Sequence, residues 1–414
     1  MRRIVADYPL LITALLLSAF GVAMVYSAGQ TDTPTVVARV YKSQLIWLFA
    51  GMVGAYAISR SSVRFIEWVT VPAYVLSILL LAATLVIGAG AGTAASTKSW
   101  LAIGGVRIGQ PSELAKLTVV LMLAHLLASR KDAPKSLLDL WQPAIIVLIP
   151  FIIIMLQPDL GTAIVFIGIF FGMLYWSGVP WPLLMLLGSP VVSLILSFST
   201  GMWGAWFLVL LALILYYRPY LVEGIILLAA NIATGVVAPI LWEKLAPYQQ
   251  NRLKVFLDPS ADPRASGYHV IQSKIAIGSG GVTGQGFTLG TQKRLAFLPE
   301  QHTDFIFAVL GEELGFLGVT VALTLFLVLF LRITQISGRA NDSFSSLVAF
   351  GLLASWFVHV LVNVGMTLNL MPITGIPLPF FSYGGSFMLA CWLAVGVLMR
   401  ISGEGRGKAA FKAS

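Results

Sequence analysis

Apolar segments that are long enough, or nearly long enough, to cross a bilayer follow one another along the whole chain. The mean hydropathy is +0.90. Hydrophobic residues make up 58% of the 414 positions, whereas charged residues make up only 10%. No stretch of appreciable size has the composition of a water-soluble domain. Because backbone hydrogen bonds must be satisfied inside the membrane, we expect an all-α polytopic membrane protein, with residues 1–414 forming a single domain.

The apolar segments predict about ten to twelve membrane-spanning helices. The short pair over 181–217 is either an extra pair of helices or one re-entrant hairpin, and the rest of the topology is the same in both cases. The expected helices lie near 8–27, 44–60, 69–90, 112–129, 142–156, 160–177, 181–199, 203–217, 220–241, 304–331, 344–368 and 385–401.

Lysine and arginine are distributed unequally between the two sets of loops. The short loops of one set carry only Arg39, Lys42, Lys98 and Arg107. The positive-inside rule therefore places both termini, including a tail over 402–414, in the cytoplasm. The net charge of +9 mostly reflects the cytoplasmic loops, so it does not indicate binding to nucleic acid. These loops carry Arg2, Arg3, Arg60, Arg64, Arg130, Lys131, Lys135, Arg218, Arg332, Arg339, Arg400, Arg406, Lys408 and Lys412.

The longest polar segment, residues 242–303, falls on the outer face by the same count. A loop of this length between two spans is often functional. It contains the glycine-rich run IGSGGVTGQGFTLG over 277–290, which is either a flexible turn or a place where backbone N–H groups approach a ligand. The basic residues of the loop are Lys244, Arg252, Lys254, Arg264, Lys274, Lys293 and Arg294.

Three polar clusters interrupt the spans at their predicted outer ends. Glu113 and Lys116 share one helix face, because they are three residues apart, and they either brace the helix as an ion pair or orient a substrate. Asp159 follows a proline and either caps the next helix or lines a cavity. The segment 377–386 is a rigid loop that, taken alone, is simply a turn. Unrelated structural features would be scattered over both faces, so the common location of these clusters favours a functional site.

A fourth cluster, over 299–318, places acidic residues at the start of an apolar run and inside it. Acidic side chains are expensive in hydrocarbon and usually mark a site. His302 either influences Asp304 or only forms hydrogen bonds, and the second interpretation is preferred. Glu312 and Glu313 lie within the span, so at least one must face the protein or a wet cavity, and we expect a structural role for them.

Five motifs in this order resemble those of the SEDS family of bacterial cell-wall polymerases (shape, elongation, division and sporulation). They are QPSELAK (110–116), QPDLGTA (157–163), YHVIQSKIAIGSGG (268–281), LPEQHTDFIFAVLGEELG (298–315) and GIPLPFFSYGGS (375–386). The resemblance covers nearly the whole chain. The sequence before LPEQHTDF is more similar to the RodA branch, which serves elongation, than to the FtsW branch, which serves division. Most family members resemble ten-span proteins, so the pair at 181–217 is a departure.

The resemblance implies a peptidoglycan glycosyltransferase that polymerises lipid II for cell elongation and rod shape. It implies a bacterial cytoplasmic (inner) membrane location, surrounding membrane lipids and an active site on the extracytoplasmic face. It also implies a class B penicillin-binding protein as transpeptidase partner, with MreC and MreD nearby. The essential acid of the family falls on Asp304. The supporting or substrate-binding candidates are Glu113, Lys116, Asp159, Arg252, Lys274, His302, Thr303, Ser382 and Tyr383.

The chemistry fits these residue types. Chain extension joins a sugar hydroxyl to a donor carbon whose leaving group is a polyprenyl pyrophosphate, and the hydroxyl needs a general base. We expect Asp304 to be this base in a single inverting displacement. No cofactor is certain, and a divalent cation on Asp159 or Glu113 is one possible source of positive charge for the pyrophosphate. The other source is the loop, with the glycines of 278–286 and the cations Arg252, Lys274, Lys293 and Arg294.

Two other classes of function fit part of the sequence. A transporter or lipid flippase would explain the many spans and the buried acids, but it would need polar residues through the midplane of the membrane, where few are found. A non-catalytic scaffold for a transpeptidase would explain the membrane location but not the charged outer loop.

Overall fold

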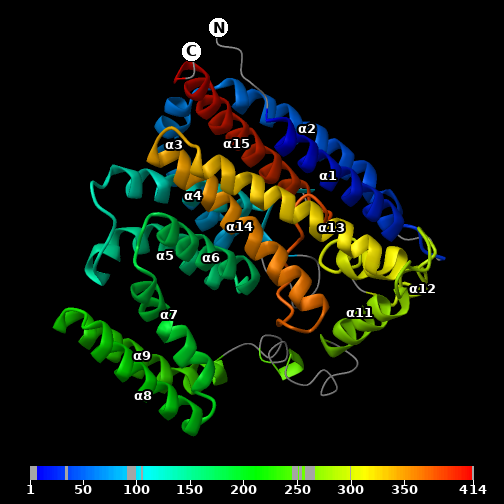
Figure 1. The fold of residues 1–414 in the computed structure, drawn as a ribbon. Helices are drawn as coiled ribbons and strands as arrows, with labels where there is room; N and C mark the ends of the chain where they lie inside the picture. The colour runs from blue at the N-terminus through cyan, green and yellow to red at the C-terminus, as the bar shows by residue number, and fades with distance from the viewer. Residues whose placement is uncertain are drawn as a thin grey trace.

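The computed structural model describes residues 7–32, 36–90, 99–103, 106–244, 250, 254–256, 266–298 and 300–412. Figure 1 shows long helices that run side by side with a common slant. Within the described residues, nine helices are long and apolar enough to cross a membrane, and Leu160–Trp176 and Trp181–Leu196 are shorter apolar helices. The expectation of an all-α polytopic membrane protein is confirmed.

The helices of the bundle lie close to the ranges expected from the apolar segments. Short polar side chains cap the start of several of them by accepting a backbone N–H, as Asp7 does for the helix that starts at Tyr8 and Asp342 for the helix that starts at Ser343. In chain order they are α1 (Tyr8–Ala28), α2 (Val40–Arg60), α3 (Val63–Ile87), α4 (Pro111–Ser129), α5 (Trp141–Leu156), α6 (Leu160–Trp176), α7 (Trp181–Leu196), α8 (Thr200–Tyr217), α9 (Leu221–Lys244), α13 (Ile306–Gly338), α14 (Ser343–Thr367) and α15 (Gly385–Lys412). The 3₁₀ turns η1 (Val36–Arg39) and η2 (Leu137–Leu140) precede α2 and α5.

The structure contains two features that the sequence did not predict. A small antiparallel sheet in the order β1 (Gly88–Ala89), β2 (Trp100–Ile103) and β3 (Val106–Gly109) lies between α3 and α4. The long loop over 242–303 also contains helices, namely α11 (Ser266–Gly280) and α12 (Thr291–Arg294).

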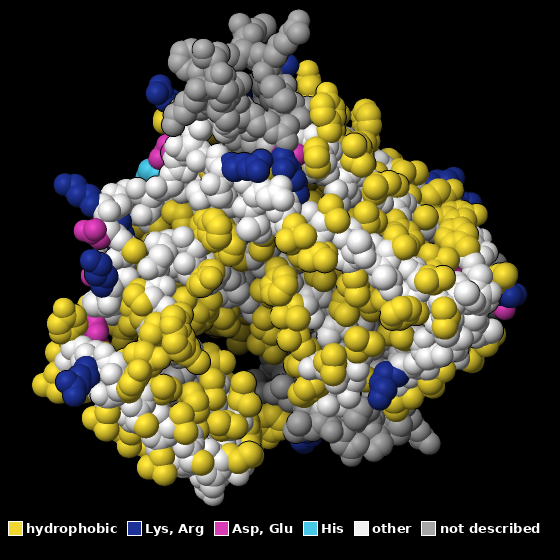
Figure 2. Space-filling model, in the orientation of Figure 1, with side chains coloured by type: hydrophobic (Ala, Val, Ile, Leu, Met, Phe, Trp, Pro, Cys, Tyr) yellow, Lys and Arg dark blue, Asp and Glu magenta, His cyan; other side chains and the backbone are white. Residues whose placement is uncertain are grey.

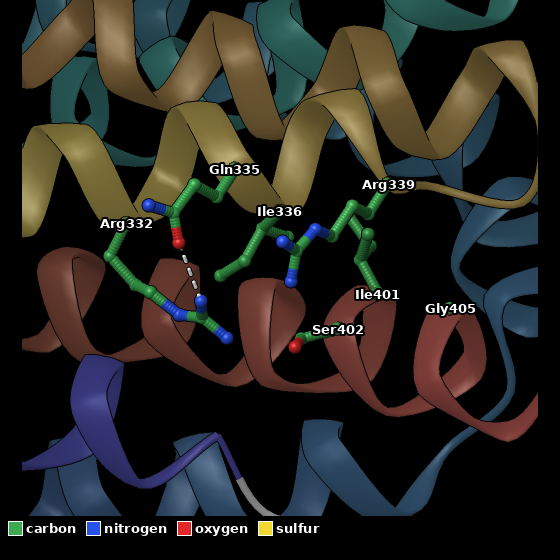
Figure 3. A pocket seen from close by; sticks show the side chains of 7 residues that line it. All are labelled: Arg332, Gln335, Ile336, Arg339, Ile401, Ser402 and Gly405. Carbon is green, nitrogen blue, oxygen red and sulfur yellow. Dashed lines mark hydrogen bonds between the residues drawn. The ribbon is translucent and has the colours of Figure 1, made fainter. Parts of the chain in front are cut away.

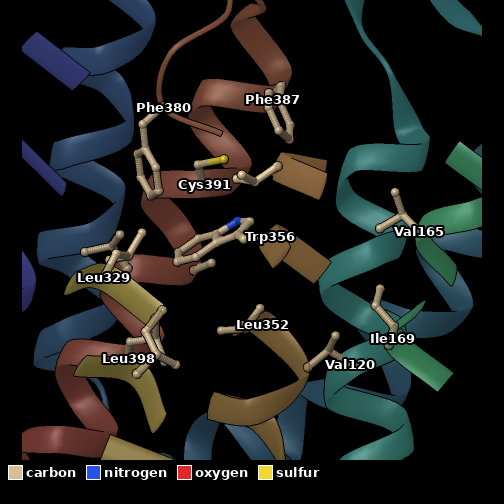
Figure 4. Close-up of a cluster of buried hydrophobic side chains, with 14 of the residues drawn as sticks. Val120, Val165, Ile169, Leu329, Leu352, Trp356, Phe380, Phe387, Cys391 and Leu398 are labelled. Atoms are coloured by element: carbon tan, nitrogen blue, oxygen red, sulfur yellow. The ribbon is translucent and has the colours of Figure 1, made fainter. Parts of the chain in front are cut away.

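The buried core is shared by helices from both halves of the chain. Helix α14 packs against α4, α6 and α13, and α15 packs mainly against α2. Figure 4 shows how side chains from α4, α6, α13, α14 and α15 meet in one cluster. Its labelled members are Val120, Val165, Ile169, Leu329, Leu352, Trp356, Phe380, Phe387, Cys391 and Leu398.

Helices α7, α8 and α9 form a lobe at one edge of the molecule, at the lower left of Figure 1. Helix α7 packs mainly on α8 and α9. Buried Asn231 of α9 joins the three helices, because its amide receives a 2.5 Å hydrogen bond from Ser193 and donates one of 2.8 Å to Ser189, while Trp206 donates to Ser193. Figure 2 shows apolar side chains over this lobe and a hollow between it and the rest of the bundle.

Candidate functional site

The segment 374–386, which runs from the loop after α14 into the first turn of α15, contacts the other three polar clusters of the sequence. The Pro377 carbonyl lies 2.9 Å from the His359 ring, and the Tyr383 N–H donates to the carbonyl of His302 at 2.9 Å. The Ser386 hydroxyl accepts from the backbone N–H of Gln110 at 3.3 Å. At the start of the segment, the Thr374 carbonyl would be 2.5 Å from a Cβ at residue 161, so only glycine fits in the Gly161 position. The structure therefore brings the four clusters together around one loop.

Glu113 and Lys116 form a buried ion pair in the first turns of α4. The Lys116 ammonium lies 2.8 and 3.0 Å from the two Glu113 oxygens, and both side chains are almost inaccessible to water. The same ammonium lies 2.8 Å from Nε2 of His359 in α14. Because Nδ1 of His359 faces the Pro377 carbonyl, we infer that Nδ1 carries the proton and that Nε2 accepts from Lys116. The network thus runs from α4 through α14 to the loop.

Asp159 caps α6. Its carboxylate accepts from the backbone N–H of Thr162 at 3.1 Å and from the Thr162 hydroxyl at 2.9 Å, and the Gln110 amide approaches at 3.3 Å. Among the described residues there is no group of three or more side chains suited to hold a metal ion. The carboxylates of Asp159 and Glu113, the two acids considered for a divalent cation, are each engaged by N–H or O–H donors.

Asp304 lies in the turn that precedes α13 and is half-buried. Asn363 of α14, which is fully buried, donates to the Asp304 carbonyl at 3.0 Å and to the Ile376 carbonyl at 2.8 Å. Gly375 has a φ of +71°, and a Cβ there would lie 3.1 Å from an Asp304 carboxylate oxygen. A side chain at 375 would therefore be strained and would crowd the acid.

His302 and Thr303 shape the turn that carries Asp304. Thr303 donates to the carbonyl and the carboxylate of Glu300, at 3.2 and 3.1 Å. The His302 ring lies 5.8 Å from that of Tyr383. Burial lowers the pKa of His302 below its usual value, and the charge of Glu300 opposes this effect without cancelling it.

Ser382 stabilises the loop. Its hydroxyl accepts from the backbone N–H of Leu378 at 2.8 Å, and its carbonyl accepts from the buried amide of Gln44 at 3.0 Å. Gln44 also accepts from the backbone N–H of Gly384 at 3.3 Å. One polar side chain of α2 thus holds the turn that carries Ser382 and Tyr383.

Comparison with known proteins agrees with this arrangement of motifs. The family model for FtsW, RodA and SpoVE, described as a cell cycle protein, matches residues 8–210 and 203–407. The chain belongs to the FtsW/RodA/SpoVE family. It is 36% identical to the peptidoglycan glycosyltransferase RodA of Treponema pallidum, over 96% of this chain and 97% of that one, and 35% identical to the peptidoglycan glycosyltransferase MrdB of Escherichia coli K12, over 95% and 93%.

Solved structures of FtsW/RodA/SpoVE proteins have the same fold. One, from a study of polymerization and crosslinking by a peptidoglycan synthase complex, has a TM-score of 0.71 at 28% identity and covers 96% of this chain and 98% of that one. The rod shape determining protein RodA of Thermus thermophilus has a TM-score of 0.62 at 25% identity, over 97% and 98%.

Two cations of the long loop, Lys293 and Arg294, are paired with acidic residues other than Asp304. Lys293 is fully buried and lies 2.9 Å from Glu313, and it also donates to the carbonyls of Ser27 and Thr288. Arg294 is half-exposed and pairs with Asp32. Lys274 is exposed on α11, with no hydrogen bond or ion pair to the described residues around Asp304. Arg252 lies outside the described residues.

The glycine-rich run over 277–290 forms backbone hydrogen bonds with α13. That helix is broken at Gly315, where φ is +59°. The N–H groups of Gln285 and Gly286 donate to the carbonyls of Glu312 and Glu313, and the N–H of Phe316 donates to the Gly281 carbonyl. These bonds replace the helical ones that the break removes. The N–H groups of Gln285 and Gly286 are therefore committed to α13.

Glu312 and Glu313 have the structural role that we expected. Glu312 accepts from the backbone N–H groups of Gln292 and Lys293 at 2.7 and 3.3 Å and so caps α12. Glu313 is paired with Lys293 and also accepts from the hydroxyl of Ser27 in α1. Together they fasten the loop to the bundle.

Sequence reasoning missed the polar residues that support the site. They are Ser27, Gln44, His359 and Asn363, and all four lie inside apolar spans. Polar side chains at such positions are unusual, and the spacing of His359 and Asn363, four residues apart on one helix face, was a usable signal.

Proposed function

We propose that this protein is a peptidoglycan glycosyltransferase of the RodA type that polymerises lipid II, with Asp304 as the general base. The observation that supports this most directly is the position of Asp304. Its backbone is held by Asn363, beside the loop at which all the motifs meet. Relatives named peptidoglycan glycosyltransferase RodA and MrdB are 36% and 35% identical, whereas three relatives named FtsW are 33%, 33% and 32% identical, which favours a role in elongation.

The chain's own residues would act as follows. The Asp304 carboxylate accepts the proton of the acceptor sugar's 4-hydroxyl while the hydroxyl oxygen attacks C1 of the donor. The bond between C1 and the phosphate oxygen breaks, and its electron pair leaves with the polyprenyl pyrophosphate. A single displacement of this kind inverts the configuration at C1 and needs no covalent enzyme intermediate. Asn363 fixes the backbone of Asp304 and Gly375 leaves room beside its carboxylate, so that the hydroxyl meets it in a productive geometry.

We place the site at the extracytoplasmic face, with both termini in the cytoplasm. The support is the lysine and arginine bias of the short loops. As partner we infer a class B penicillin-binding protein that crosslinks the strands, with MreC and MreD as further partners implied by the family resemblance. A similar solved structure comes from a peptidoglycan synthase complex that coordinates polymerization and crosslinking.

The decisive experiment is polymerisation of labelled lipid II by purified protein with its transpeptidase, comparing wild type with Asp304→Asn. Removal of a general base costs about 10²–10⁴-fold in rate. Glu300→Gln is a matched control, since Glu300 is an exposed acid in the same turn. The proposal is supported if the folded Asp304→Asn variant makes no glycan strands while Glu300→Gln still makes them. Equal polymerisation by Asp304→Asn and wild type would show that Asp304 is not the base.

A further inference from the structure

A cavity lies at the ends of α13 and α15 that are remote from Asp304. Its volume is about 420 Å³, which is within the range of small-molecule sites. Two arginines line it and no acidic side chain does, as Figure 3 shows. The lining residues are Arg332, Gln335, Ile336, Arg339, Ile401, Ser402 and Gly405.

Arg332 forms the fixed wall of this cavity. Its guanidinium donates to both carboxylate oxygens of the buried Asp7, at 2.9 and 2.8 Å, and to the Gln335 side chain at 2.7 Å. The Ser402 hydroxyl donates to Asp7 as well. The charge of Arg332 is therefore balanced, and α1, α13 and α15 are held together at this point.

Arg339 is different, because no described side chain balances its charge. It is exposed at the end of α13, and its guanidinium has no hydrogen bond or ion pair with the described residues. Figure 3 shows the side chain extending from the end of α13 into the cavity, with its guanidinium beside Ile336 and on the side of Ser402. The carbonyl of Arg339 approaches Gly405 so closely that a Cβ there would be 2.9 Å away, so the two helices meet at this point. Within the described part of the chain, the cavity thus carries one positive charge without a counter-charge.

The lining has the chemistry of a site for a phosphate ester. A guanidinium presents several N–H donors in a planar fork that matches phosphate oxygens. Ile336 and Ile401 add an apolar wall, which suits the glycerol and acyl portion of a lipid better than a bare ion. By the lysine and arginine bias, this end of the bundle is at the cytoplasmic leaflet, where anionic lipid headgroups are found.

We propose that this cavity binds the phosphate group of an anionic membrane lipid, with Arg339 as the principal contact and Arg332, held by Asp7, as the rigid side of the site. Free phosphate shares this chemistry, but it would leave the apolar wall uncovered. The competing explanation is that Arg339 only balances the carbonyl end of α13, as cations at helix C-termini do.

The test measures the Tm of purified protein in zwitterionic detergent as short-chain phosphatidylglycerol, short-chain phosphatidylcholine or inorganic phosphate is added. Native mass spectrometry counts the bound lipids in parallel. Arg339→Gln is compared with Arg64→Gln, which removes an exposed arginine at the same face outside the cavity. Both variants should fold, because neither side chain has a partner in the described structure.

We expect phosphatidylglycerol to raise the Tm of wild type and of Arg64→Gln in a saturable way. For Arg339→Gln we expect the apparent affinity to fall about tenfold, which corresponds to one charge-assisted hydrogen-bond pair. An unchanged response of Arg339→Gln would overturn the proposal, as would an equal loss in Arg64→Gln or an equal effect of phosphatidylcholine. If inorganic phosphate reproduced the full rise in Tm, the assignment to a lipid would be wrong.

Discussion

The side-chain amide of Asn363 donates to the backbone oxygen of Asp304 at 3.0 Å. The same amide donates to the carbonyl of Ile376 at 2.8 Å. One buried side chain therefore holds both the proposed base and the loop at which the motifs meet. The relative position of the base and the loop is therefore set by α14, which packs against α4, α6 and α13.

We predict that Asn363→Leu lowers the polymerisation rate by about 10²-fold, the effect of displacing a reacting group by roughly 1 Å. Leucine keeps the volume but leaves two buried carbonyls without a donor, which also costs about 1–3 kcal/mol of stability for each. Rates over a range of lipid II concentrations separate the two effects. A lower kcat with an unchanged KM supports a positioning role, whereas wild-type kinetics in the Leu variant would exclude it.

The buried pair of Glu113 and Lys116 predicts a non-additive pattern. Glu113→Gln or Lys116→Met alone leaves an uncompensated buried charge and should destabilise the protein by about 3–5 kcal/mol. The double variant Glu113→Gln/Lys116→Met should recover most of this loss. Thermal unfolding in detergent measures the effect. If the pair acts as a brace, the double variant also recovers its rate to within about tenfold; a stable but inactive double variant would instead indicate direct contact with substrate.

Lys293→Met should destabilise the fold but should not weaken binding of the pyrophosphate of lipid II. The reason is that the Lys293 ammonium is fully buried against Glu313. We expect a loss of about 3–5 kcal/mol in unfolding free energy. Arg294→Gln is the neighbouring control, and its half-exposed pair with Asp32 should contribute at most about 1 kcal/mol. A Lys293→Met protein of normal stability that has lost its affinity for lipid II would contradict this assignment.

His302 should matter for stability in acid but not for the rate near neutral pH. Because burial lowers its pKa below 6.5, the folded state binds a proton less readily than the unfolded state. Stability is therefore lost as the pH falls through about 6.5, and His302→Gln should reduce this loss. The check is the difference in Tm between pH 7.5 and 5.5 for the two proteins. The rate of the Gln variant from pH 6.5 to 8.5 should follow the wild-type profile, and a displaced profile would show that His302 participates in proton transfer.

The spans could be predicted well because hydrocarbon allows few alternatives for an apolar segment. The break of α13 at Gly315 could not, since it depends on a loop inserted from residues 281–286, and local propensity contains no information about that partner. The sheet β1–β3 has strands of only two to four residues, and its first strand continued the apolar run of α3. Helix α11 was missed because it lies in a segment assigned to a loop by its polarity.

For the site, the types and the order of the residues in the sequence identified the candidates. The sequence did not predict in which direction each side chain points. Glu113 and Lys116 were expected to share a face, and they do. Lys293 was treated as an available cation because it lies in a basic loop, yet its side chain points to Glu313 in the interior. The supporting roles of His359 and Asn363 depend on the carbonyls of Pro377 and Ile376, which approach only after α14 and the following loop have folded back together.

The lobe of α7, α8 and α9 suggests how a membrane enzyme can lengthen without disturbing its chemistry. Asn231 satisfies its hydrogen bonds within the lobe, and the buried carboxylate of Glu223 in α9 accepts from the backbone N–H of Leu137 in η2, which ties the lobe to the bundle. The described motif residues all lie before α7 or after α9. An ancestral duplication or insertion at this edge would therefore change the surface that faces lipid. The order of the motifs along the chain would stay the same. The turn between α7 and α8 is accordingly the place where we would expect natural relatives to differ most in length.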